Sequence, residues 1–147
     1  MKIVKPIPDG FHTVTPYFIV QGAMRLVDFL RQAFDGEVIQ LSKRPDGVLM
    51  HAQLRIGDSF VMVGEVGPGF NPMPAMINLY VTDADSVYKR TLEAGATSLM
   101  EPTDQFYGDR NAGVVDPCGN HWWIATHKED VSPEEMRKRI EAKFKQA

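Results

Sequence analysis

The amino-acid sequence predicts an α+β protein made of two consecutive βαβββ modules followed by a C-terminal helix. The same order of strand-like and helix-like patterns occurs twice in the 147 residues. A stretch rich in proline and glycine, residues 66–74, separates the two copies. Matching landmarks in the two copies, 61, 59 and 62 residues apart, are Val20 and Val81, Gly36 and Gly95, and Gly57 and Gly119. A period of this length is typical of a duplicated supersecondary unit.

The first module, about residues 11–65, is expected to begin with a strand over 15–20, which is rich in aromatic and β-branched residues. Apolar residues then recur at helical spacing over 23–34, and Gly36 stands where the end of a helix often needs a positive φ. Three strands separated by turn sequences complete the module, over residues 38–41, 48–56 and 60–63.

The second module, about residues 75–127, repeats this order after the linker. A strand is expected over 76–81, and Asp83 is placed to cap a helix that ends at Gly95. The last two strands are joined by the turn Asp116-Pro117-Cys118-Gly119. The three strands after the helix are expected over residues 97–100, 112–115 and 122–126.

A final helix is predicted over residues 132–146. Ser132 is the expected N-cap, Pro133 suits the first helical position, and Glu135 is placed to complete a capping box.

Composition and charge narrow the classes of function. The chain has 16 Lys and Arg residues against 19 Asp and Glu, a net charge of −3, which is unlike a nucleic-acid-binding protein. No apolar run approaches the roughly 18 residues of a membrane-spanning helix, and the N-terminus lacks the apolar core of a signal peptide. The single cysteine, Cys118, excludes an intrachain disulfide and a cysteine-based zinc cluster. We expect one cytoplasmic domain, residues 1–147, that binds neither nucleic acid nor a membrane.

A duplicated βαβββ unit with Asp-Pro-x-Gly-Asn before its last strand resembles the glyoxalase/bleomycin-resistance/dioxygenase superfamily (vicinal oxygen chelate, VOC). The PhnB-like branch is suggested by residues 50–59 (MHAQLRIGDS), 107–110 (YGDR) and 116–131, which include DPCGN and ATHKEDV. The resemblance covers about residues 11–140. It implies the glyoxalase-like fold and a homodimer with swapped or side-by-side modules. It leaves the reaction open, because the superfamily includes lyases, isomerases, dioxygenases and metal-free drug-binding proteins.

Metal-using members of the superfamily take their ligands from the first and last strands of each module. The resemblance places Thr15, Val61, Met76 and Trp123 at these positions. None of these side chains is the His or carboxylate that Zn, Ni, Mn or Fe sites use. We therefore expect neither a metal nor another cofactor at these positions.

Strand alternation predicts what lines the cup that the two modules form in this family. Apolar walls with a few polar groups are typical of a small-molecule pocket. Arg110 is a further candidate that could meet an anionic substrate, although an ion pair that holds its loop is the favoured explanation. The residues expected in the cup are aromatic (Tyr17, Tyr80, Trp123) or polar (His51, Gln53, Asn78, His121).

These residues favour a small-molecule-binding protein without the usual metal ligands, of the drug- or metabolite-binding or resistance type, with an unknown organic ligand. The alternative is a glyoxalase-like lyase or isomerase that uses His51 as a base, or a displaced metal held by His51 and His121. Structural explanations also stand: His51 could bond to a neighbouring strand, and Trp123 could fill the space of an absent ligand. His127 is expected to pair or cap. A vestigial cup in a protein that acts by association is a third possibility.

Overall fold

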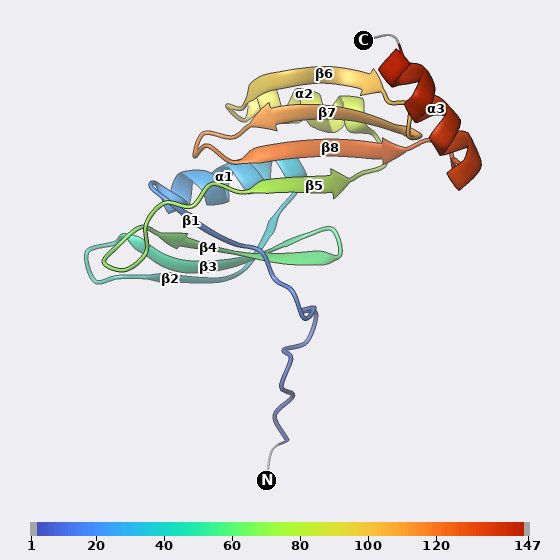
Figure 1. Ribbon diagram of the computed structural model, residues 1–147. Helices are drawn as coiled ribbons and strands as arrows, with labels where there is room; N and C mark the ends of the chain where they lie inside the picture. Colours follow the sequence, from blue (N-terminus) through green and yellow to red (C-terminus); the bar gives the residue numbers. More distant parts are fainter. Residues whose placement is uncertain (1–2, 146–147) are drawn as a thin grey trace.

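A computed structural model describes residues 3–145 and shows two modules followed by a helix (Figure 1). The first module contains β1 (Tyr17–Val20), α1 (Ala23–Phe34), β2 (Glu37–Lys43), β3 (Leu49–Ile56) and β4 (Ser59–Glu65). The second contains β5 (Met76–Tyr80), α2 (Ala84–Glu93), β6 (Thr97–Asp104), β7 (Asp109–Val115) and β8 (His121–His127). Helix α3 (Pro133–Lys145) follows, and residue 146 of the predicted helix lies outside the described residues.

Each module forms one four-stranded sheet with the same topology. Sheet 1 has the order β1-β4-β3-β2 and sheet 2 the order β5-β8-β7-β6. In both sheets the first strand of the module pairs in parallel with the last, and the other pairs are antiparallel. The predicted α+β fold of two βαβββ modules with a C-terminal helix is therefore confirmed.

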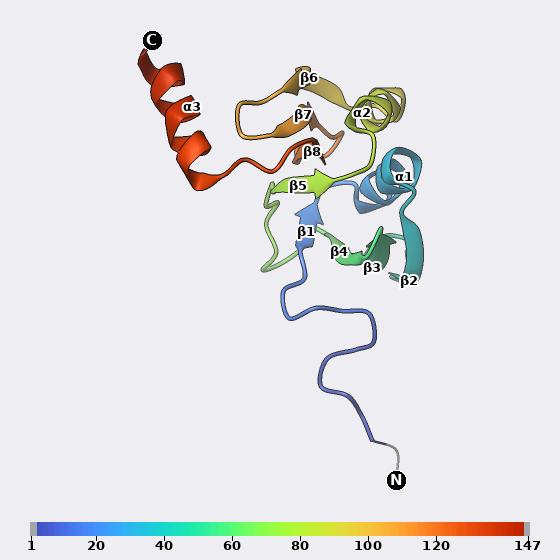
Figure 2. The same ribbon diagram turned by 90° about the vertical axis from the view of Figure 1, so that its right-hand side faces the viewer.

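One hydrophobic core joins the two modules. The rings of Phe18 in β1 and Trp122 in β8 lie 5.5 Å apart, and Phe34 at the end of α1 lies 4.9 Å from the same indole. The indole N–H of Trp122 donates to Asp116 at 2.8 Å, which satisfies a buried donor. Both sheets thus turn their helix-covered sides toward this shared core (Figure 2). The opposite side of each sheet, called its outer face below, points away from the core and from the other outer face.

The ends of the helices follow local chemistry. Asp83 caps α2 by accepting the amide of Ser86 at 3.2 Å, and Ser132 accepts the amide of Glu135 at 3.1 Å. The carboxylate of Glu135 bonds to Arg139.

The end of α1 differs from the sequence prediction. The positive φ, 54°, belongs to Asp35, which lies before Gly36. Gly36 is required for space, because a Cβ there would lie 2.9 Å from the carbonyl oxygen of Leu30.

Every helix among residues 3–145 is too short or too polar to cross a membrane.

Candidate ligand-binding faces

On the outer face of sheet 1, Tyr17 reaches across one strand to His51. The phenol oxygen lies 2.9 Å from Nδ1 of His51 on β3, and β4 runs between the two residues. Gly64 of β4 makes room for the ring, since a Cβ at that position would lie 3.1 Å from the phenol oxygen. One side of the Tyr17 ring is therefore covered by backbone, while the side chain stays 45% exposed overall.

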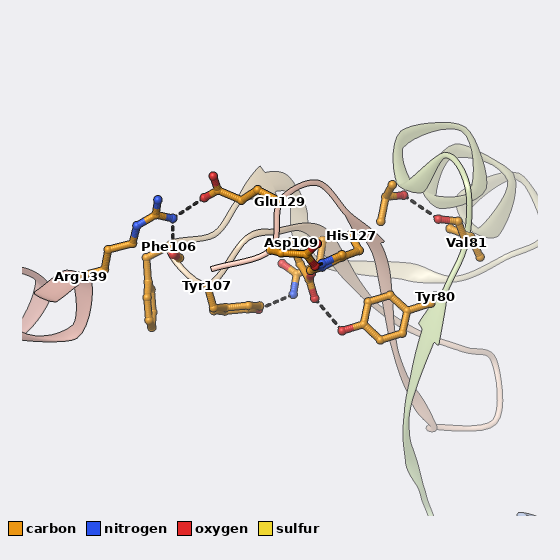
Figure 3. Close-up of polar contacts among 11 residues, drawn as sticks. Tyr80, Val81, Phe106, Tyr107, Asp109, His127, Glu129 and Arg139 are labelled. Carbon is orange, nitrogen blue, oxygen red and sulfur yellow. Dashed lines mark hydrogen bonds and ion pairs between the residues drawn. The ribbon is translucent and has the colours of Figure 1, made fainter. Parts of the chain in front are cut away.

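On the outer face of sheet 2, Tyr80 makes the same kind of crossing. Its hydroxyl donates to Oδ2 of Asp109 on β7 at 2.8 Å, and β8 runs between them (Figure 3). The residue of β8 in register with Tyr80 is Ala125, which is 1% exposed. A methyl group there leaves room for the phenol ring to cross, and Tyr80 remains 65% exposed.

Trp123 is the third aromatic residue that lies over a neighbouring strand. Its indole covers Gly113 of β7 so closely that a Cβ on residue 113 would lie 2.4 Å from a ring carbon. The indole N–H is buried and has no hydrogen-bond partner among the described residues. A buried donor without a partner is costly, and an acceptor from outside the chain reaches this one only if the indole shifts.

Asp109 links Tyr80 to a histidine. The Asp109 side chain is 8% exposed, and its second oxygen lies 2.7 Å from Nδ1 of His127. Nε2 of His127 lies 2.7 Å from Asp130 (Figure 3 shows the Tyr80, Asp109 and His127 side chains). Hydrogen bonding to Asp109 and then to Asp130 raises the pKa of His127, and the same Asp109 carboxylate raises the pKa of Tyr80. With a carboxylate at each ring nitrogen, the charged imidazolium is the form of His127 that can donate to both Asp109 and Asp130.

An amide network extends this cluster toward the turn before β7. Asn111 donates through Nδ2 to the hydroxyl of Tyr107 at 2.7 Å and accepts from Gln105 at 3.0 Å. The sequence analysis did not select Asp109, Asn111 or Tyr107. The sequence predicts this strand only from residue 112, whereas β7 begins at Asp109. Strand alternation counted from residue 112 therefore does not extend to Asp109 and Asn111, which share a face with residue 113.

The structure separates the predicted cup residues into two groups. Tyr17, His51 and Gln53 lie on the outer face of sheet 1, and the other group lies on the outer face of sheet 2. The two groups do not meet within one chain, because the outer faces point in different directions (Figure 2). The residues on sheet 2 are Asn78, Tyr80, His121 and Trp123.

Arg110 lies on the other side of sheet 2. It alternates with Asp109 and Asn111 along β7, and its guanidinium bonds to Asp85 of α2 at 2.8 Å and to Asp104 at 3.2 Å. The first of these carboxylates, followed by the second, raises the pKa of Arg110. Arg110 therefore links α2 to β6 and lies apart from both groups of cup residues.

The sequence model of one protein family, the Glyoxalase/Bleomycin resistance protein/Dioxygenase superfamily, matches residues 11–124 of this chain. The chain belongs to this superfamily. An uncharacterized protein of Mycobacterium tuberculosis, Rv0887c, is 34% identical over 135 residues, which cover 84% of this chain and 79% of the relative. Among solved structures, TioX from Micromonospora sp. ML1 has a TM-score of 0.64 at 24% identity, covering 78% of this chain and 98% of its own. The fosfomycin resistance protein FosX from Mesorhizobium loti has a TM-score of 0.59 at 18% identity, covering 80% and 92%. These two structures share the fold.

The superfamily's metal positions can now be located on the structure. Val61 is not one of them, because it is 4% exposed and faces the core; Met62, which pairs with Tyr17 as Trp123 pairs with Asn78, takes its place. The four positions then hold Thr15, Met62, Met76 and Trp123. This donor set does not fit a hard divalent metal, which binds His and carboxylate groups.

Metal-binding residues do not gather elsewhere in the described part of the chain. Within residues 3–145, no three His, Cys, Asp or Glu side chains are placed to hold an ion. His51 and His121, the alternative pair, lie on the outer faces of different sheets.

Proposed function

We propose that this chain is a cytoplasmic, PhnB-like member of the superfamily that binds a small organic molecule without a metal, at a site that a second copy of the chain completes. The PhnB-like placement is supported by the YGDR and DPCGN stretches and by residues 125–131. Drug or metabolite binding, including resistance, is the class of function that this site suits.

The observation that carries the proposal is the way three aromatic rings lie across the sheets. Tyr17, Tyr80 and Trp123 each cover a glycine or an alanine of the adjacent strand. The inner side of each ring is therefore fixed, and Tyr17 and Tyr80 keep 45% and 65% of their surface exposed. Rings held in this manner suit stacking with a flat ligand, and contacts of this kind contribute about 0.5–1.5 kcal/mol beyond burial.

Polar groups beside the rings can orient a ligand. Trp123 offers an indole N–H without a partner, and Asn78 lies directly opposite Trp123 on β5. On sheet 1, His51 is oriented by its hydrogen bond to Tyr17. Apolar surface with a few polar anchors is the usual composition of a small-molecule site.

A second copy supplies the missing wall of the cup. The outer faces point apart within one chain, so sheet 1 of one copy facing sheet 2 of another would enclose a ligand between them. Met76 on the outer face of sheet 2 is 70% exposed, a large apolar side chain that such a contact would cover. Two such contacts related by a twofold axis give a closed homodimer with two equivalent cups.

The test is a screen of small aromatic compounds by tryptophan fluorescence, with Trp123→Phe as the matched variant. Trp122 is fully buried, so the quenching that depends on the ligand should disappear in Trp123→Phe. Metal analysis of protein purified without chelator belongs to the same experiment. Stoichiometric metal in the wild-type protein, or quenching that is unchanged in Trp123→Phe, contradicts the proposal.

A second candidate, a lyase or isomerase, is favoured by the Tyr17–His51 hydrogen bond. If Nδ1 of His51 donates to the Tyr17 oxygen, Nε2 of His51 carries the lone pair and can take a proton from a carbon next to a carbonyl, which is the chemistry of an isomerase. The test is exchange of carbon-bound hydrogen of dihydroxyacetone in D2O, followed by NMR. Exchange above background that is lost in His51→Ala supports this function, and background exchange with wild type contradicts it for this substrate class.

A further inference from the structure

We propose that the Tyr80 ring selects a positively charged organic molecule, with the Asp109 carboxylate at the hydroxyl end of the ring supplying the negative charge and His127 controlling its strength. This inference rests on the proposed small-molecule function and specifies the chemistry of its ligand. It assigns binding roles to Asp109 and His127, two residues outside the predicted cup.

The first step is the effect of Asp109 on Tyr80. The phenol O–H donates to a carboxylate that is 8% exposed, over a distance of 2.8 Å. A phenol that shares its proton with an anion has a more electron-rich ring, and the exposed side of that ring attracts cations more strongly. The same chain contains a contact of this type, because the ammonium of Lys143 lies 4.7 Å from the centre of the Phe106 ring.

The charged groups that bond to one another near the Tyr80 ring carry more negative than positive charge. Asp109 on β7 and Asp130 after β8 both face His127, so this trio has two negative charges and at most one positive charge. The side chains beside Tyr80 on the same face, Asn111 and Trp123, are neutral.

Two arginine side chains near this face are occupied. Arg110 points to the other side of the sheet and bonds to Asp85 and Asp104. Arg139 of α3 bonds to Glu129 and to the carbonyl of Phe106 (Figure 3). A ligand cation beside Tyr80 would therefore meet the Asp109 and Asp130 carboxylates, with neither of these arginines paired to them.

The protonation of His127 controls how strongly Asp109 attracts a cation. Its imidazolium neutralises part of the charge on Asp109, and loss of its proton leaves two carboxylates with no cation between them. The affinity of a cationic ligand should therefore rise with pH as His127 loses its proton. Since hydrogen bonds to Asp109 and Asp130 raise its pKa, this rise is centred above the ordinary value of about 6.5.

The experiment compares three phenyl-ring compounds of different charge: benzyltrimethylammonium, benzyl alcohol and benzenesulfonate. Binding to the full-length protein is followed by tryptophan fluorescence at pH 6 and pH 8.5. We expect the cation to bind at least tenfold more tightly than the sulfonate, with an affinity about threefold higher at the upper pH. His127→Gln should bind the cation equally well at both pH values.

Two variants test the origin of the preference. Asp109→Asn should reduce the cation-to-anion ratio to near one, while Asp58→Asn, which removes the same charge at an exposed turn, should leave it unchanged. Tyr80→Phe keeps the ring and removes the hydrogen bond, so it should lower the ratio several-fold without weakening benzyl alcohol. This variant carries the test if Asp109→Asn does not fold.

Equal binding of the three compounds, or a preference for the cation that survives in both Asp109→Asn and Tyr80→Phe, overturns this inference and leaves the proposed function standing. If none of the three compounds binds while the aromatic screen yields a ligand, the inference also fails alone. If no compound of either set binds, the proposed function fails with it.

Discussion

The indole of Trp123 lies directly over Gly113, and the two residues are paired across β8 and β7. A Cβ on residue 113 would come within 2.4, 2.6 and 2.8 Å of three carbons of the ring. Real Cβ contacts are never so close, so this glycine is required by the position of the ring. The flat placement of Trp123, and with it the shape of the outer face, depends on a residue with no side chain.

Gly113→Ala should therefore displace Trp123 and destabilise the protein. Overpacking at a buried, well-ordered position costs about 1–3 kcal/mol of the free energy of unfolding. Urea unfolding measures this cost, and tryptophan emission should shift to longer wavelength as the indole moves toward water. The control is Gly67→Ala, where a Cβ would meet no atom within 4 Å. Equal stability and emission of the two variants would show that the indole does not depend on Gly113.

The His127 bridge should make stability depend on pH. Its pKa is raised in the folded protein by Asp109 first and Asp130 second, so the folded state binds the proton more tightly than the unfolded state. The stabilisation is complete below the unfolded pKa of about 6.5 and is lost as pH rises through the folded pKa. Urea unfolding across this range should show a decline that is absent in His127→Gln. The decline should remain in His12→Gln, which changes an exposed residue before β1.

Much of the fold could be predicted because its signals are local. Helical spacing predicts the helix over residues 23–34, and Asp83 predicts where α2 begins. Strand alternation predicts that Trp122 lies in the core and Trp123 on the outer face. Each of these signals lies within a few residues of the element it defines. One local error, the positive φ at Asp35 in place of Gly36, arose because crowding by a carbonyl also demands glycine.

The candidate site was less predictable because its contacts join distant strands. Tyr80 and Asp109 are 29 residues apart, and Tyr17 and His51 are 34 apart. Alternation shows which face a side chain occupies but not which strand it reaches across. It also cannot show whether two faces of one chain meet. The separation of the outer faces follows from the contact between Phe18 and Trp122, which no local pattern encodes.

The protein should be a homodimer, with roughly twice the 16.5 kDa mass of one chain in light scattering at micromolar concentration. Met76→Asp places a charge on the outer face of sheet 2, where Met76 is 70% exposed, and should shift the mass toward one chain and weaken ligand binding. Lys89→Asp changes an exposed residue of α2, away from the outer faces, and should leave the dimer intact. A wild-type mass of one chain would contradict the dimer, and an unchanged Met76→Asp mass would place the interface elsewhere.

Replacing Trp123 by glutamate should not create a metal site. The change restores a carboxylate at one of the superfamily's ligand positions, but Thr15, Met62 and Met76 still lack the His or carboxylate donors that a divalent metal needs. Metal analysis after dialysis against nickel or zinc should therefore find far less than one ion per chain in Trp123→Glu.

The triple variant Thr15→His, Met76→His, Trp123→Glu supplies three donors, and we expect it to retain metal. Because Thr15 precedes β1 while the other two lie on the outer face of sheet 2, those donors converge only if sheets of two copies face each other. Metal retention by the dimeric triple variant, lost when Met62→Arg is added to disrupt the contact of sheet 1 without adding a metal ligand, would support both the ligand positions and the shared cup. Stoichiometric metal in Trp123→Glu alone would show that other residues complete the site.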